Sequence, residues 1–107
     1  EAGGLDSILI SSVEDIFSTP TSYSLYQNYP NPFNPVTTIR FQIPYFQKVE
    51  LKVFDILGRE VTTLVNEEKI AGVYEITFDA ADLASGVYFY RLNTQDFIES
   101  KKLLLLK

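Results

Sequence analysis

A few turn carboxylates are the side chains best placed to do chemistry in this chain of 107 residues. Asp79 and Asp82 stand three residues apart around a predicted loop, and Asp55 lies in another predicted turn. Paired carboxylates can act as a general acid and base, and clustered carboxylates can bind calcium. However, the spacing does not match an EF-hand loop, and Asp in turns commonly accepts hydrogen bonds from nearby backbone N–H groups. We therefore predict that all three carboxylates cap turns and that no metal ion or other cofactor binds.

Several reactive residue types are missing altogether, because the chain contains no His, Cys, Met or Trp. Their absence excludes imidazole bases, thiolate nucleophiles, disulfides and the common zinc sites. The sequence also lacks a G-x-S-x-G nucleophile motif, a Walker loop, a dinucleotide-binding glycine motif and the H-E-x-x-H zinc motif. We therefore expect that the protein is not an enzyme.

The charge of the chain is distributed unevenly. Fourteen Asp and Glu against nine Lys and Arg give a formal net charge of -5. Four of the acids and none of the bases lie in residues 1–22, so residues 23–107 are nearly neutral. Affinity for nucleic acid depends on Lys and Arg that neutralise phosphates, and crossing a bilayer takes roughly 20 consecutive apolar residues. We expect no nucleic-acid partner and no membrane span.

Composition divides the chain near residue 22. Residues 1–22 mix acids, Ser, Thr, Gly and one proline with a few aliphatic side chains, and they hold no period for long, which predicts a linker. Ser7 to Val13 could pair with a sheet edge, and a helix over Ser11 to Phe17 is the competing interpretation. A linker strand together with exposed sheet edges would also allow strand exchange between copies of the chain. Residues 23–107 fit one domain.

Short alternating segments recur through residues 23–107 at the spacing of an all-β sandwich or barrel. The clearest is Val36 to Ile43, where every second residue is apolar, as in a half-buried strand. Gly58 lies in a turn in which it can adopt a positive φ, and a loop is expected over residues 66–69. The strand of residues 86–93 carries apolar side chains on both faces and is expected in the middle of a sheet. The other predicted strands cover residues 23–26, 49–53, 60–65, 73–79 and 97–106.

The segment "NYPNPFNP", residues 28–35, concentrates three prolines just before the clearest strand. Proline fixes its own φ, lacks an N–H and favours an extended conformation in the residue before it, so this segment cannot join a central ladder. We expect Asn31 and Asn34 to bond local backbone and Phe33 to be anchored in the core. A rigid crossover that seals one end of the sandwich is the favoured interpretation, and a binding loop is the alternative.

The final "KKLLLLK" also allows two interpretations. As a last strand, its leucines would fill the core and its lysines would protect a sheet edge. As a basic C-terminus, it would be recognised by another molecule. Both can hold together, because core leucines would keep the lysines in fixed positions.

Four segments in order carry a family resemblance: "YSLYQNYPNPFNPVTTIRFQIP", "LKVFDILGREVTTLV", "AGVYEITFDAADLASGVYFYRL" and "KKLLLLK". Over about residues 23–107 the chain closely resembles the type A C-terminal sorting domain of the type IX (Por) secretion system of Gram-negative bacteria. These domains are similar to the immunoglobulin-like domain of the flagellar hook-capping protein. The resemblance implies an all-β, immunoglobulin-like β-sandwich of about seven antiparallel strands.

The resemblance also implies which residues are recognised, by position Pro30, Asn31, Pro32 and Phe33, then Gly86 and Tyr88, then Lys101, Lys102 and Lys107. It implies that an outer-membrane translocon recognises the domain after the preceding cargo domain has crossed the inner membrane. A surface sortase, a cysteine peptidase, would then cut just before the domain, near Ser18 to Ser22, and could join the cargo to an anionic lipopolysaccharide. The implied location is the periplasm in transit, then the outer-membrane surface or the extracellular space.

A non-catalytic accessory or carbohydrate-binding module of a larger extracellular enzyme is the alternative function. Exposed tyrosines such as Tyr26 or Tyr45 could stack on sugar rings. Trp is absent, however, and no predicted strand places a row of aromatic residues on a solvated face. The sequence therefore favours a sorting signal for protein transport over a sugar-binding module.

Overall fold

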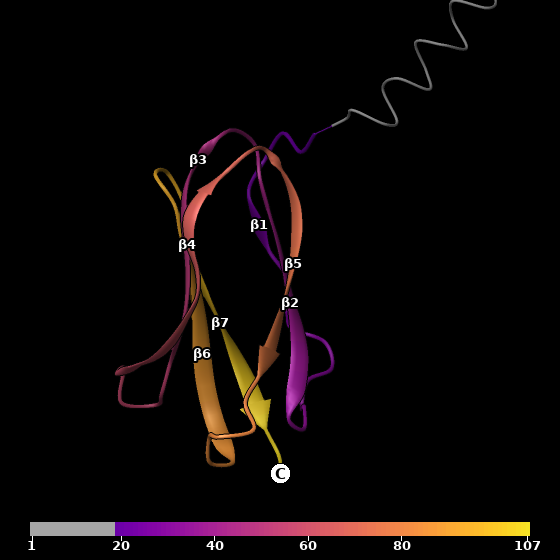
Figure 1. The fold of residues 1–107 in the computed structure, drawn as a ribbon, viewed down its shortest axis with the longest axis vertical. Coiled ribbons are helices and arrows are strands. Elements are labelled where there is room, and N and C mark those ends of the chain that lie inside the picture. The colour runs from indigo at the N-terminus through magenta and orange to yellow at the C-terminus, as the bar shows by residue number, and fades with distance from the viewer. Residues whose placement is uncertain (1–18) are drawn as a thin grey trace, which may run out of the picture.

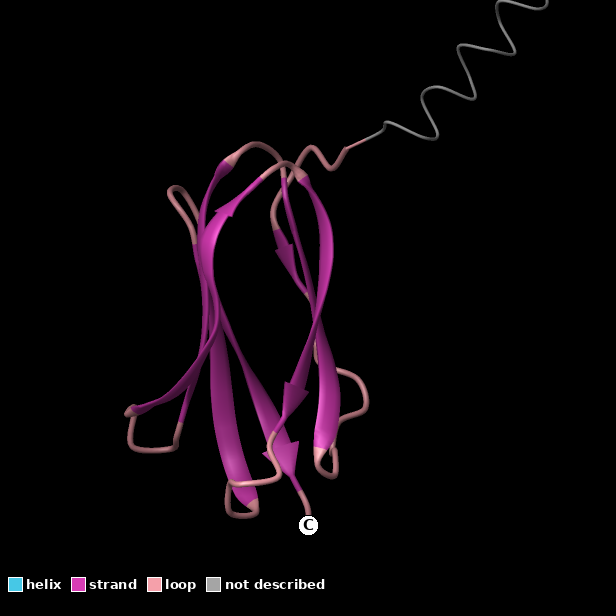
Figure 2. Ribbon diagram, viewed as in Figure 1, coloured by secondary structure: helices cyan, strands magenta, loops and turns pink. Residues whose placement is uncertain are grey.

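The computed structural model describes residues 19–107. The strand expected over residues 7–13, which strand exchange would require, and the competing helix lie outside the described residues. Two antiparallel sheets face one another in an all-β sandwich (Figures 1 and 2). The described strands are β1 (Ser24–Leu25), β2 (Val36–Ile43), β3 (Gln47–Phe54), β4 (Glu60–Lys69), β5 (Gly72–Asp79), β6 (Gly86–Asn93) and β7 (Ile98–Leu105). The predicted immunoglobulin-like sandwich of seven antiparallel strands is confirmed.

Each sheet follows its own strand order. One sheet has the order β1-β2-β5, and the other has the order β4-β3-β6-β7. Strand β6 therefore lies between two neighbours, which confirms the central position predicted from its apolar residues. Residues 19–107 contain no helix, and so none that is long and apolar enough to cross a membrane.

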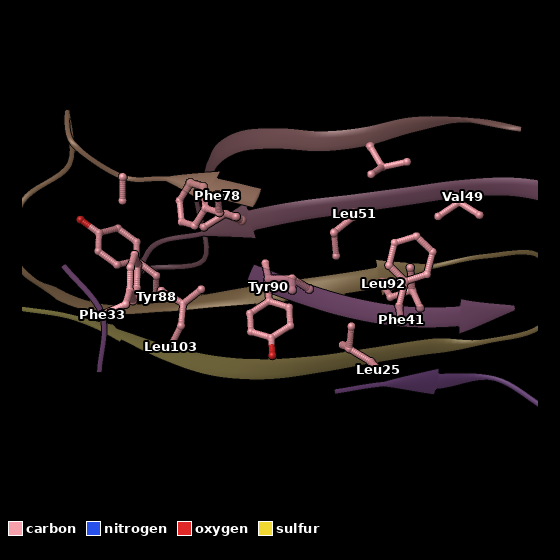
Figure 3. Close-up of a cluster of buried hydrophobic side chains, with 14 of the residues drawn as sticks. Leu25, Phe33, Phe41, Val49, Leu51, Phe78, Tyr88, Tyr90, Leu92 and Leu103 are labelled. Atoms are coloured by element: carbon pink, nitrogen blue, oxygen red, sulfur yellow. The ribbon is translucent and has the colours of Figure 1, made fainter. Parts of the chain in front are cut away.

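The core fills the space between the sheets with alternate side chains of the central strands (Figure 3). A period-2 alternation places every second residue of a strand on one face. The predicted inward faces are confirmed, since these residues are fully buried: Ile39, Phe41, Ile43, Val49, Leu51 and Val53. On β7, Leu103 and Leu105 are fully buried as predicted, whereas Leu104 is half-buried and Leu106 is exposed, so only two of the four leucines fill the core.

Strand β4 corrects one expectation. The loop predicted over residues 66–69 is wrong, because β4 continues to Lys69, which pairs with Gln47 of β3. Residues 65–69 pair with β3 in regular register, but residues 66–69 are all polar, so no apolar–polar alternation identifies a strand there. Strand β4 is also an edge strand, where polar residues are favoured because they oppose edge-to-edge pairing.

Two of the three turn carboxylates, Asp55 and Asp79, cap backbone groups as predicted, whereas Asp82 accepts no hydrogen bond within residues 19–107. The Asp55 carboxylate accepts hydrogen bonds from the N–H groups of Leu57 and Arg59 and from the Arg59 guanidinium, at 2.8–2.9 Å. The bond from the Arg59 backbone is the main cause that holds the pKa of Asp55 below its usual value. Gly58 adopts a φ of 83°, as expected. Asp79 accepts from the N–H of Ala81 at 3.0 Å.

A buried tyrosine hydroxyl joins the two sheets. Tyr90 on β6 donates to the carbonyl oxygen of Tyr26 at 2.6 Å and accepts from the N–H of Asn28 at 2.8 Å. The Asn28 side chain in turn donates to Thr37 Oγ1 at 3.0 Å and to the carbonyl of Pro30 at 3.1 Å. Burial raises the pKa of Tyr90 to about 12, so the hydroxyl stays protonated and can donate well into the alkaline range.

We predict that Tyr90→Phe lowers the free energy of unfolding by about 1 to 3 kcal/mol, because the buried N–H of Asn28 loses its acceptor. Urea denaturation of the wild type and the variant measures the change. Tyr74→Phe is the control, since the Tyr74 hydroxyl bonds the Ile70 carbonyl at an exposed position. Equal losses in the two variants would contradict a special role for the buried hydroxyl.

Candidate recognition site around the last strand

The proline-rich segment lies along the edge of β7 that faces away from β6. The Phe33 N–H donates to the carbonyl of Leu104, and the Leu106 N–H donates to the carbonyl of Phe33, both at 3.0 Å. The Leu104 N–H donates to Asn31 Oδ1 at 3.0 Å, and the Gln27 amide donates to the carbonyl of Lys102 at 2.7 Å. The segment therefore covers the backbone groups of the C-terminal half of β7.

This placement corrects two expectations. The segment covers a sheet edge, whereas the sequence predicted that it seals an end of the sandwich. Asn31 bonds a residue 73 positions away, not local backbone, and the Asn34 side chain makes no hydrogen bond within residues 19–107. The asparagine that bonds local backbone is Asn28, whose side-chain amide donates to the carbonyl of Pro30. The peptide bonds that precede Pro30, Pro32 and Pro35 are cis.

Phe33 anchors the segment in the core, as predicted. Its side chain is 2% exposed and packs against Phe78 of β5, with ring centroids 6.0 Å apart. Its backbone forms a parallel bridge with Leu105. By contrast, Pro30, Asn31 and Pro32 are exposed, so a partner could reach them directly.

The glycine and tyrosine of the second predicted motif begin β6, beside the same part of β7. Gly86 pairs with Leu105 and has a φ of 151°, a conformation that side-chain-bearing residues rarely adopt. Tyr88 pairs with Leu103. Its ring lies in the core, and its hydroxyl donates to the carbonyl of Ala84 at 2.7 Å, which ties the loop between β5 and β6 to the sheet.

The three predicted lysines point in different directions. Lys101 shares the inward-facing side of β7 with Leu103 and forms an ion pair with Glu99 at 3.4 Å. Lys102 is exposed on the outer face of the sheet. The Lys107 ammonium donates to the carbonyl of Ala81, and its N–H donates to the Ser85 hydroxyl at 3.0 Å. The lysines therefore form no single basic cluster.

All three motifs nevertheless converge on one short piece of backbone. Leu105 pairs with Gly86 on one edge of β7 and forms the bridge with Phe33 on the other. Sequence reasoning missed Gln27, Asn28 and Tyr90, which fix the segment to β7 and β6. No local pattern could identify them, because their partners lie 62 to 75 residues away.

The structure also shows the surroundings of the residues considered for sugar stacking, metal binding and acid–base chemistry. The Arg40 guanidinium lies 5.2 Å from the centre of the Tyr26 ring, and the Tyr45 hydroxyl donates to Asp96, so both proposed sugar-stacking residues already have partners. No group of three acidic side chains that could hold a metal ion occurs within residues 19–107. Asp82 lines a hollow of about 230 Å³ with Val61 and Leu83.

We predict that Asn31→Ala costs about 1 kcal/mol of stability and speeds hydrogen exchange at the Leu104 amide, because that N–H loses its acceptor. Exchange measured by NMR and urea denaturation test this. Asn34→Ala is the matched control in the same segment and should change neither quantity measurably. If both variants exchange alike at Leu104, the Asn31 bond does not hold β7.

One of three comparisons with known proteins found a match. The model of the family described as "Secretion system C-terminal sorting domain" matches residues 27–106. The match includes eight of the nine predicted recognition residues, and Lys107 lies just beyond it. The comparisons with curated proteins and with solved structures found no match. Because the family match covers well over half of the chain, this chain belongs to the C-terminal sorting domains of the type IX secretion system.

Proposed function

We propose that this domain is the signal by which the outer-membrane translocon recognises a cargo protein that precedes it and has passed through the periplasm. Membership of the family makes the chain a type IX sorting domain, and proteins secreted by this system reach the cell surface or the extracellular space. The observation that carries the finer proposal is the convergence of the three motifs on Leu103 to Leu105 of β7. The domain itself would catalyse nothing.

The proposed signal is the folded domain. Leu103 and Leu105 are fully buried, so the last strand keeps its position only while the core is intact. The exposed residues Pro30, Asn31 and Lys102 are held beside that strand by backbone and side-chain hydrogen bonds. A partner that reads these groups together would therefore recognise the fold, because an unfolded chain separates them by about 70 residues.

We also propose that a surface sortase removes the domain by cutting close to its first strand. Of the stretch predicted from the family resemblance, Ser18 lies outside the described residues, whereas Thr19, Thr21 and Ser22 are exposed. All seven described strands follow this stretch, so a cut there would release the sandwich intact. Cargo would then remain at the surface, where it could be joined to lipopolysaccharide.

The test is export of a reporter fused ahead of the full 107-residue chain, in a bacterium that carries the type IX system. We predict that the reporter reaches the surface and that processing removes a mass below the 12.2 kDa of the full chain, because a cut near Ser18 to Ser22 leaves the preceding residues on the reporter. Surface labelling followed by mass spectrometry measures both. A reporter that reaches the surface equally well without the chain would overturn the proposal.

Lysine substitution is a sharper probe than truncation, because deleting the last residues would remove core leucines and unfold the domain. Replacing Lys102 and Lys107 by Ala leaves Leu103 and Leu105 in place. We expect at least about a fivefold loss of surface reporter, which corresponds to about 1 kcal/mol of lost recognition. Lys48→Ala, an exposed lysine near the other end of the same sheet, is the matched control.

A further inference from the structure

The outer face of the four-stranded sheet carries an unusual set of side chains where β3, β6 and β7 lie side by side. The strand registers align two rows of outward residues, Phe54, Phe89 and Lys102 in one row and Lys52, Arg91 and Ser100 in the other. These positions alternate with the buried core residues of the same strands, so they face solvent. We call these six residues the basic-aromatic face. None of them is acidic.

Two cations of this face form no ion pair within residues 19–107, although the charge of Arg91 contributes, after the bonds from Thr63 and Lys52, to holding the pKa of Glu60 below its usual value. Lys52 is paired with Glu60 of β4 at 3.4 Å, and Glu60 also accepts from Thr63 at 2.7 Å. Arg91 and Lys102 form no ion pair with a described residue. The Arg91 guanidinium instead lies 4.5 Å from the centre of the Phe54 ring, a cation–π contact that holds it over the aromatic surface.

The face is hollowed and borders further apolar side chains. A hollow of about 310 Å³ is lined by Phe54, Phe89, Arg91 and Ser100 and by the adjoining turn, whose Asp55 carboxylate is already paired with Arg59 at 2.8 Å. A second hollow of about 400 Å³ includes Val87 and the adjoining turn between β3 and β4. Ile56 and Leu57 at this turn are 69% and 74% exposed. Exposed aliphatic side chains next to aromatic residues and an unpaired arginine are characteristic of protein interfaces.

The outer face of the other sheet provides a contrast within the same molecule. There Arg40 lies directly opposite Glu75, and Thr38 lies opposite Thr77. Asp79, opposite Val36, adds a second anion, so this face carries no excess of positive charge across β2 and β5. The excess of positive charge over aromatic surface belongs to only one of the two outer faces.

We propose that the basic-aromatic face is the surface on which an acidic protein partner docks, with carboxylates that meet Arg91 and Lys102 and aliphatic side chains that cover Phe54 and Phe89. This rests on the proposed function, because the partner is then a component of the secretion machinery. Because the unpaired charges of this face are positive, a complementary partner surface is negatively charged. A membrane is a poorer fit, because recognition of anionic lipid surfaces commonly uses about four to eight clustered Lys and Arg, whereas this face has two unpaired cations.

Two substitutions of exposed strand residues test the face without removing any packing. Ser100→Glu places a carboxylate opposite Arg91, whereas Thr77→Glu places one on the outer face of the other sheet. In the reporter assay with the full chain, we expect Ser100→Glu to lower surface display about tenfold through repulsion of the partner. We expect Thr77→Glu and Ser100→Lys to stay within about twofold of the wild type. Equal effects of the two glutamates would overturn the inference.

Photo-crosslinking from the same position provides a readout that does not depend on the stability of the glutamate variant. With p-benzoylphenylalanine at Ser100, a covalent adduct to a protein of the host supports the docking face, provided that the same probe at Thr77 gives less of it. An adduct to lipid or lipopolysaccharide, or no adduct from a chain that is exported, would overturn it. If the wild-type chain itself fails to direct export, the proposed function fails, and the inference fails with it.

Discussion

The structure depends on how the backbone of β7 is satisfied on both of its edges. Strand β6 pairs with one edge in regular antiparallel register, and the proline-rich segment covers the C-terminal half of the other. Uncovered edges attract other strands, so a sheet must protect them. Pro30, Pro32 and Pro35 have no N–H. The segment can therefore form a few hydrogen bonds with β7, but its own outer side lacks the regular row of N–H groups that another strand would need for pairing. The arrangement protects the edge and at the same time fixes the motifs that define the family.

Polar contacts in the interior select this arrangement. The Tyr90 hydroxyl and the Asn28 side chain form a chain of buried hydrogen bonds that runs from β6 to the start of the proline-rich segment. Leaving any of these groups without a partner in the core would be costly. The apolar core therefore determines that the two sheets pack, whereas this polar chain determines where the segment lies between them. Recognition at β7 thus depends on residues that a partner never touches.

Much of the fold was predictable from the sequence, because β2 and β3 alternate cleanly between apolar and polar residues and Gly58 marks a turn. Strand β4 was predicted too short, since residues 66–69 of this edge strand are all polar and show no alternation. Of the candidate site, the burial of Phe33 followed from its aromatic side chain among prolines. The partner of Asn31 did not, because a contact with Leu104 is decided by the packing of distant strands and leaves no local signal.

The bond between Asn31 and Leu104 joins residues 73 positions apart, and β7 is the last of the described strands. Contacts that are so distant in sequence form late, since the entropy of closing a long loop is lost before any contact is gained. The early proline-rich segment can contact β2, β5 and β6 before then, but it lacks its backbone partners on β7 until that strand has formed. A partner that binds the proline-rich segment on β7 therefore binds only chains whose translation has continued through β7.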